Sequence, residues 1–280
     1  MISIFNDQKC VLGEGPLWHP EAGHLFWFDI LRKKIFQTVN GVISQHKFHE
    51  YVSAAGWIDQ KSLLIASETS LSTFNFVTGQ KEHLAKLEND NPLTRSNDGR
   101  ADPHGGFWIG TMAKDASKGQ GAIYRYYGGE LRQLFAPITI SNSICFSVDG
   151  LHAYFADTVT HKIMKWPLNE KNGWPVGEPY TFIDLSTEGL FPDGSIVDEL
   201  GYLWNAQWGA GRVARYSPSG TYVDDIAFPA SQITCPAFGG EEMKTLFVTS
   251  ASLNLKEPEA GRTFTIETEF RGQKEHSVRL

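Results

Sequence analysis

The stretch RSNDGRADPHGGFWIGTM, from Arg95 to Met112, contains the pattern that decides the fold. Residues 95–100 are polar and are predicted to form a turn, and a second turn at 103–106 leads into an apolar strand at 107–109. The same order of opening residue, turn and apolar strand recurs along the chain. Such a repeat predicts an architecture rather than an isolated loop.

Six units follow this pattern, and they open at Glu14, Ala54, Asn97, Asn142, Asp193, and Thr234 or Cys235. In the third, fourth and fifth units the turn glycine lies eight residues after the opening residue, as from Asn142 to Gly150. In the first unit the offset is nine residues, from Glu14 to Gly23. The opening residues of the third to fifth units are 45 and 51 residues apart. This spacing gives the repeat a defined register.

A period of about 40 to 50 residues with several strands in each unit is typical of a β-propeller. We therefore predict an all-β fold, a six-bladed β-propeller with four-stranded antiparallel blades, as a single domain over residues 1–280. A pair of β-sandwiches is the alternative, but sandwiches do not require such a repeat. A strand at 262–268 or one at 3–5 is expected to pair across the join and close the ring.

Composition excludes several kinds of partner. The net charge is −7 and no segment concentrates positive charge, so nucleic acid and anionic membranes are not expected partners. Cys10, Cys145 and Cys235 form no CxxC pair, which predicts free thiols and a reducing compartment. The first ten residues lack the features of a signal peptide, and no apolar run reaches membrane-spanning length. We expect a soluble cytoplasmic protein.

Four of the opening residues carry a carboxylate or a carboxamide: Glu14, Asn97, Asn142 and Asp193. In a propeller the inner strands surround one channel, so these side chains are expected to meet at one rim. Two carboxylates gathered there repel each other unless a cation lies between them. Oxygen donors favour Ca²⁺, Mg²⁺ or Mn²⁺, and the absence of HxH, HExxH and CxxC patterns argues against a conventional zinc site. The alternative is that these Asn and Asp residues only form turns.

Five segments resemble the regucalcin and gluconolactonase family, which includes senescence marker protein and luciferin-regenerating enzyme, over nearly the whole chain. They are LGEGPLWHPEAGHLFWFDI (12–30), RSNDGRADPHGGFWIGTM (95–112), SNSICFSVDG and the following FAD (141–157), FPDG and the strand LW (191–204), and FGGEEMKTLFVTSA (238–251). The spaced string NDG-x-x-DP-x-G-x-x-W-x-G-T-M makes the resemblance specific. The family's fold is also a six-bladed propeller.

The resemblance implies a hydrolase that opens a sugar lactone, such as a gluconolactone-like aldonolactone, to the aldonic acid. By position it implies metal ligands at Glu14, Asn142 and Asp193, and substrate-binding residues at Arg95 and Asn97. We expect Asp193 to be catalytic as well, taking a proton from the attacking water. One divalent cation is expected, Ca²⁺ first, with Mg²⁺, Mn²⁺, Zn²⁺ or Fe²⁺ as alternatives.

Two other functions stay open. A metal at the rim of a propeller can also serve a carboxylesterase or a phosphotriesterase, and a propeller can bind a ligand without catalysis. One departure from the family is Ser143, because the family usually has glycine after the fourth-blade asparagine; a positive φ there would strain a serine. Specificity is expected to come from rim segments 54–57, 87–94 and 187–191. The sequence makes no prediction of oligomeric state.

Overall fold

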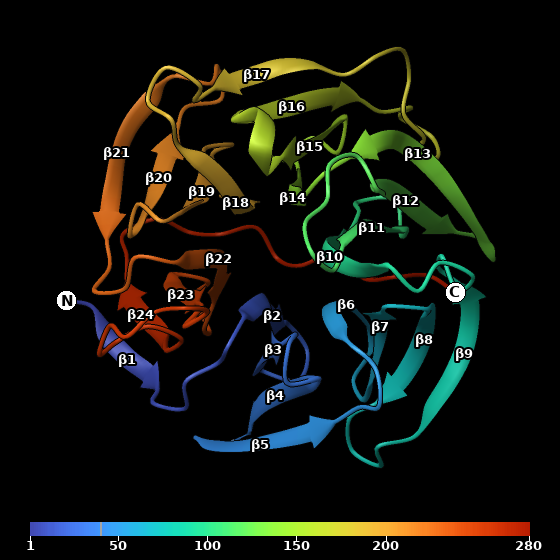
Figure 1. Cartoon of the computed structure of the whole chain (residues 1–280), viewed down its shortest axis with the longest axis horizontal. Helices are drawn as coiled ribbons and strands as arrows, with labels where there is room; N and C mark the ends of the chain where they lie inside the picture. The colour runs from blue at the N-terminus through green and yellow to red at the C-terminus, as the bar shows by residue number, and fades with distance from the viewer. Residues whose placement is uncertain (40) are drawn as a thin grey trace.

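The computed structural model describes residues 1–39 and 41–280. Six four-stranded sheets stand around a central channel, as Figure 1 shows. Every neighbouring pair of strands whose register is defined is antiparallel, as in β2–β3 and β10–β11. The six-bladed propeller predicted from the repeat is therefore confirmed. In the described part of the chain there is no helix long and apolar enough to cross a membrane.

The first three blades each consist of four consecutive strands, from the innermost to the outermost. Blade one contains β2 (Gly13–His19), β3 (His24–Asp29), β4 (Lys34–Val39) and β5 (Val42–Lys47). Blade two contains β6 (Val52–Asp59), β7 (Ser62–Ser67), β8 (Ser70–Asn75) and β9 (Lys81–Lys86). Blade three contains β10 (Thr94–Ala101), β11 (Phe107–Ala113), β12 (Gly121–Tyr127) and β13 (Glu130–Ile138).

The remaining blades follow the same order, except that the last one takes a strand from the N-terminus. Blade four contains β14 (Ser141–Phe146), β15 (His152–Asp157), β16 (Lys162–Pro167) and β17 (Tyr180–Asp184), with the short 3₁₀ helix η1 (Thr158–Thr160) after β15. Blade five contains β18 (Phe191–Val197), β19 (Leu203–Trp208), β20 (Arg212–Tyr216) and β21 (Tyr222–Ala227). Blade six contains β22 (Ile233–Gly239), β23 (Thr245–Ser250), β24 (Thr263–Glu267) and β1 (Ser3–Asn6).

Both strands predicted at the join take part in closing the ring. β24 is the third strand of blade six, and β1 pairs with it as the outermost strand, with Ser3 opposite Thr265. Phe5 contacts Trp27 of blade one and Phe247 of blade six, at centroid distances of 6.1 and 5.0 Å. The N-terminal strand is thus hydrogen-bonded to blade six, and the aromatic packing of Phe5 connects it to blade one.

The turn glycines of the repeat lie where the register predicts them. Gly23, Gly105, Gly150 and Gly201 have φ values of 65°, 91°, 70° and 86°. These are left-handed backbone conformations, which residues with a Cβ adopt only at a cost. The recurring offset of eight or nine residues in the sequence therefore reflects the reversal between the first and second strands of these blades.

The predicted turn at 95–100 is wrong, because Thr94–Ala101 is β10, the innermost strand of blade three. The segment looked like a turn because it is polar and contains a glycine. Its residues are nevertheless buried from Thr94 to Gly99, between β11 and the neighbouring inner strands. An inner strand that faces a polar channel does not need the apolar alternation by which strands are usually recognised.

Apolar side chains fill the spaces between the blades. Trp27, Trp108 and Trp204 occupy the second strands of blades one, three and five, and each is at most 1% exposed. Neighbouring sheets bury these side chains, and this burial stabilises the fold by about 25 cal/mol for each Å² of apolar surface removed from water. This packing makes the inner strands a rigid frame for the channel.

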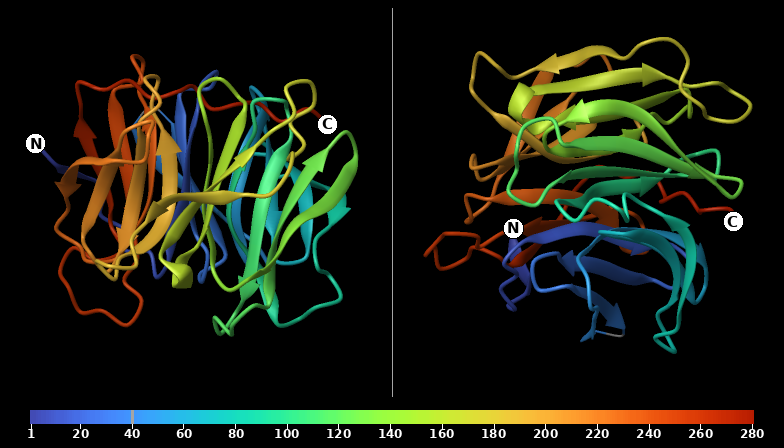
Figure 2. Two further views of the ribbon diagram at one scale, coloured as in Figure 1. Left: turned by 90° about the horizontal axis from the view of Figure 1, so that it is seen from above. Right: turned by 45° about the vertical axis from the view of Figure 1, so that its right-hand side comes forward.

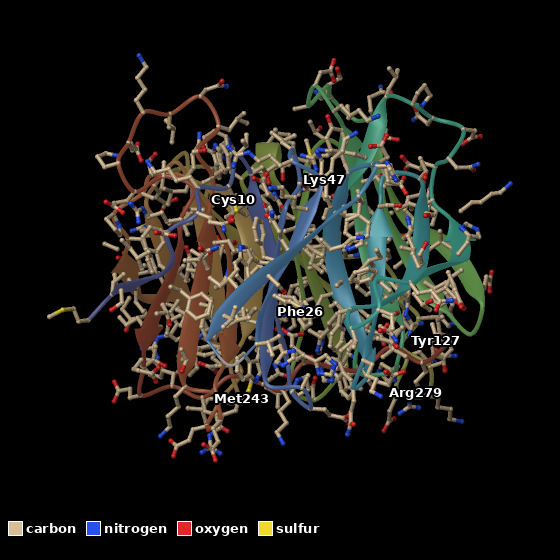
Figure 3. The ribbon with its side chains drawn as sticks, turned by 90° about the horizontal axis from the view of Figure 1, so that it is seen from below. Cys10, Phe26, Lys47, Tyr127, Met243 and Arg279 are labelled. Atoms are coloured by element: carbon tan, nitrogen blue, oxygen red, sulfur yellow. The ribbon has the colours of Figure 1, made fainter. Side chains whose placement is uncertain are left out.

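The C-terminal segment, residues 270–279, crosses one end of the channel, and we call it the C-terminal strap (Figure 1). Backbone hydrogen bonds hold the strap near both ends. Gly272 N donates to the Met243 carbonyl and Arg279 N donates to the Gly105 carbonyl, both at 2.8 Å. Figure 3 shows Met243 and Arg279 at the same face, with Cys10 toward the other. In the left view of Figure 2 the strap and η1 lie at opposite ends.

Candidate metal and substrate site

The five residues predicted for the site line one cavity of about 520 Å³. Glu14, Arg95, Asn97, Asn142 and Asp193 reach it from the inner strands of blades one, three, four and five. The cavity also contains residues of η1, so it lies at the end of the channel opposite the strap. The ring therefore brings together side chains that are far apart in the sequence.

The opening residues of blades two and six are not among the residues that line this cavity in the described chain. Ala54 has no polar group to offer. Thr234 donates its hydroxyl to the carbonyl of Gly13, at 2.6 Å, and so joins blade six to blade one. Cys235 packs against Gly194, where any side chain would collide with it. These positions hold inner strands together.

An irregularity of pairing occurs at the cavity end of the inner strands. The register shifts between Glu14 and Leu17 in β2, between Asn142 and Cys145 in β14, and between Pro192 and Ser195 in β18. Such bulges break the strict alternation of side chains and turn them in new directions. We conclude that the bulges direct Glu14, Asn142 and Asp193 toward the channel. In a regular strand, successive side chains would point to opposite faces of the sheet.

Hydrogen bonds fix the orientation of the two amides. Arg95 Nη1 donates to Asn97 Oδ1 at 2.8 Å, and Asn97 Nδ2 donates to Asn142 Oδ1 at 3.0 Å. Asn142 Nδ2 donates in turn to Thr158 Oγ1 at 2.8 Å. Because an amide oxygen has two lone pairs, Asn142 Oδ1 retains one for a further partner. The network thus presents an oxygen of Asn142, and not its nitrogen, on the side of Asn97.

The charges in the site are poorly compensated. Burial, and then the nearby Asp98 carboxylate, raise the pKa of Glu14 to about 8. Burial, and then the charge of Glu14, raise the pKa of Asp193 well above its ordinary value. Arg95 is the cation that opposes both effects, and burial lowers its own pKa to about 10. Two buried carboxylates that repel each other with one arginine beside them provide a place for additional positive charge.

The donor set fits a hard divalent cation. Glu14 and Asp193 supply anionic oxygens and Asn142 supplies a neutral oxygen, which is the donor chemistry that Ca²⁺ and Mg²⁺ prefer. Within residues 1–39 and 41–280, no three His, Cys, Asp or Glu side chains gather in a metal-binding arrangement. A cation held here by Glu14 and Asp193 would therefore have the amide oxygen of Asn142 as a third donor.

The rim of the cavity differs from the segments predicted for it. Of the segments 54–57, 87–94 and 187–191, only the last contributes a lining residue, Phe191. Lys114 and Asp115, which directly follow β11, add charged groups that the sequence analysis missed. The other residues that line the cavity are mainly apolar, and they include Leu31, Met112, Ala116, Ile140, Val159, Trp208 and Leu253.

The fold and this rim define a class of protein: six-bladed propellers with oxygen donors from several blades at one mouth of the channel. Comparison with known sequences gives the particular family. The family described as "SMP-30/Gluconolactonase/LRE-like region" matches residues 12–252. The chain belongs to this family, and the resemblance inferred from its motifs is confirmed.

Named relatives cover nearly the same length. The L-arabinolactonase of Azospirillum brasilense is 33% identical, over 96% of this chain and 93% of the relative. The 6-deoxy-6-sulfogluconolactonase of Pseudomonas putida is 33% identical, over 88% and 86%. Among solved structures, the calcium-binding protein regucalcin of Agrobacterium tumefaciens is 39% identical with a TM-score of 0.96, and the match covers 99% of this chain and 97% of that chain.

Proposed function

We propose that the protein is a metal-dependent sugar lactonase that hydrolyses an aldonolactone to the aldonic acid. One observation carries the proposal: Glu14, Asn142 and Asp193 line a single cavity together with Arg95 and Asn97. The relatives named L-arabinolactonase and 6-deoxy-6-sulfogluconolactonase support the substrate class. The neighbour described as calcium-binding supports a divalent cation, with Ca²⁺ first. The buried free thiols are compatible with the cytoplasm.

Glu14, Asn142 and Asp193 would hold the cation. When bound, the cation supplies a Lewis acid that polarises the ester carbonyl and neutralises developing negative charge. Asp193 has a second role in the proposal, as the base that takes a proton from the attacking water. That role requires the Asp193 oxygen that does not bind the cation to face the water.

Arg95 and Asn97 would orient the lactone. Asn97 Oδ1 already accepts from Arg95, so the polar group that Arg95 offers a substrate is the remainder of its guanidinium. Lys114 and Asp115 also line the cavity. Lys114 Nζ donates to Glu68 Oε1 at 3.0 Å and to the Pro92 carbonyl at 2.8 Å, which leaves one of its three donors for a sugar hydroxyl, and Asp115 adds a carboxylate acceptor. The cavity volume of about 520 Å³ lies in the range of small-molecule sites and accommodates an aldonolactone.

The test removes the metal and restores it. The chain is treated with a chelator and assayed on a panel of aldonolactones, with Ca²⁺, Mg²⁺, Mn²⁺, Zn²⁺ or Fe²⁺ added back one at a time. Activity is expected to disappear without metal and to return with at least one ion. The Asp193→Asn variant is expected to lose about 100-fold or more in kcat, while Asp184→Asn, which changes an exposed carboxylate on β17, keeps normal turnover. Full activity of Asp193→Asn would overturn the mechanism.

A second candidate, a carboxylesterase or phosphotriesterase, is favoured by the apolar residues that line the cavity. Phe191 and Val159 are 39% and 42% exposed there, which is more apolar surface than a polyhydroxylated sugar requires. The same panel should therefore include an aryl ester and a phosphotriester. A kcat/KM that is higher for these than for any aldonolactone would support the second candidate over the first.

A further inference from the structure

Ser143 has a backbone conformation that serine rarely adopts. It follows Asn142 in β14, has a φ of 59°, and is fully buried. Its counterpart in blade one is Gly15, which follows Glu14 and has a φ of 52°. In both blades the residue after a candidate metal ligand is left-handed, but only blade four places a side chain there. Such an outlier at a candidate site suggests a function for the side chain.

The residue after the candidate metal ligand faces the inner strand of the next blade. A Cβ at Gly15 would lie 2.5 Å from the carbonyl oxygen of Ser53 in blade two, closer than side chains approach a backbone. In blade four the Ser143 hydroxyl instead donates a hydrogen bond of 2.5 Å to the carbonyl oxygen of Asp193 in blade five. A contact that excludes a side chain in blade one is therefore a hydrogen bond in blade four.

The Asp193 carbonyl is held from two directions. Besides Ser143, it accepts from Asn205 Nδ2 of β19 at 3.1 Å. Ser195 Oγ donates to Ser143 Oγ at 3.1 Å, so the hydroxyl that binds the carbonyl is itself oriented. Ser143, Ser195 and Asn205 are each at most 1% exposed. Water therefore does not compete for these bonds, and the group remains ordered.

We propose that Ser143 is a positioning residue: by binding the backbone carbonyl of Asp193 it fixes the direction in which the Asp193 carboxylate enters the cavity. The inference rests on the proposed function, because it assigns the carboxylate to a cation and to the attacking water. Residues that orient a metal ligand commonly change metal affinity or activity by about 10-fold to 100-fold when they are replaced. A serine at this position is strained, but its hydroxyl makes a hydrogen bond to Asp193 that a glycine could not make.

Two substitutions separate the backbone from the hydroxyl. Ser143→Gly relaxes the left-handed backbone and removes the hydroxyl, whereas Ser143→Ala removes the hydroxyl and keeps the strain. Ser53→Ala is the matched control, since it removes a buried hydroxyl of the inner strand of blade two that binds Ser96 and not Asp193. Each protein is measured for thermal stability without metal, for Ca²⁺ and Mn²⁺ affinity by calorimetry, and for kcat and KM.

Ser143→Gly is expected to melt at or above the temperature of Ser143→Ala. Both variants are expected to bind the ions at least about 10-fold more weakly than the wild type and to lose kcat to a similar degree with little change in KM. Wild-type metal affinity and kcat in Ser143→Gly would overturn the positioning role. If the ions bind in a Ser143-dependent way but no aldonolactone is hydrolysed, the positioning role is supported and the proposed reaction is wrong.

Discussion

Arg95 is the residue of the site that combines two tasks. Its Nη1 donates to Asn97 Oδ1 and to the Ser96 carbonyl, both at 2.8 Å, while the side chain as a whole lines the cavity. Its positive charge also opposes the rise in pKa that burial causes in Glu14 and in Asp193. Arginine suits this position because one planar group serves several acceptors and keeps its charge when buried.

We expect Arg95→Ala mainly to raise KM, by about 10-fold, because it removes a charged hydrogen-bond donor that binds substrate and transition state alike. The kcat is expected to change little. Steady-state kinetics on the best aldonolactone tests this, with Arg132→Ala as the control, because Arg132 pairs with Glu130 at the exposed edge of blade three. A decrease of kcat alone would assign Arg95 to the chemical step.

His19 has a structural role that predicts a pH dependence of stability. Its Nε2 donates to the Asp59 carbonyl of blade two at 2.8 Å, and its Nδ1 accepts from the N–H groups of Glu21 and Ala22, at 3.3 and 3.2 Å. Since Nδ1 is already an acceptor, the folded protein needs the neutral ring. Burial lowers the pKa of His19 below its ordinary value of 6.5.

Because the unfolded chain binds the proton more readily, His19 contributes stability above pH 6.5 that is lost as the pH falls from 6.5 toward the folded pKa. The slope from one such group reaches at most about 1.4 kcal/mol per pH unit. Urea denaturation of the wild type and of His19→Gln from pH 8 to pH 5 should show a smaller slope in the variant. The exposed His83, replaced by Gln, serves as control. Equal slopes for all three proteins would contradict the assignment.

At the level of elements, one inner strand could not be recognised from the sequence. The inner strand β10 is buried along nearly its whole length and is nevertheless polar, because it faces the channel. The second strands could be predicted from their tryptophans and branched residues, since these pack between sheets. Inner strands depend on partners in other blades, so a local pattern of hydrophobicity misses them.

The closing strand β1 provides a test at this scale. Phe5 is half-buried against Trp27 and Phe247, whereas its neighbour Ile4 is 45% exposed. We expect Phe5→Ala to lower the free energy of unfolding by about 2 kcal/mol, less than the loss for a fully buried phenylalanine. Ile4→Ala should change it by less than about 0.5 kcal/mol. Denaturant unfolding measures both, and a negligible loss in both variants would mean that β1 contributes through its backbone alone.

At the level of the whole molecule, the strap closes the end of the channel opposite the cavity. Arg100 lies at the far end of β10 from Arg95, and it forms an ion pair with Glu275 of the strap. Both side chains are largely buried, at 11% and 7% exposure. Trp57 Nε1 also donates to the carbonyl of Glu275 at 2.8 Å, which holds the strap on blade two. A single residue of the strap thus connects two blades.

Glu275→Gln should therefore destabilise the fold by about 3 kcal/mol, because it removes the ion-pair partner of the buried Arg100. Thermal and denaturant unfolding would measure the loss. Glu130→Gln breaks an exposed ion pair with Arg132, whose side chains are 57% and 51% exposed, and is expected to have little effect. A stability of Glu275→Gln close to that of the wild type would show that the strap is held by its backbone bonds.

The sequence by itself determined the number of blades, because its turn glycines and apolar strands recur with a period of about 40 to 50 residues. It also determined which oxygen-bearing residues open the units, and its motifs identified the family. Only the tertiary structure decided which of these residues share a cavity, how the bulges direct them, and that Ser143 binds the carbonyl of Asp193. Turns and strands follow from neighbouring residues, whereas these contacts join residues about 50 positions apart and exist only when the ring closes.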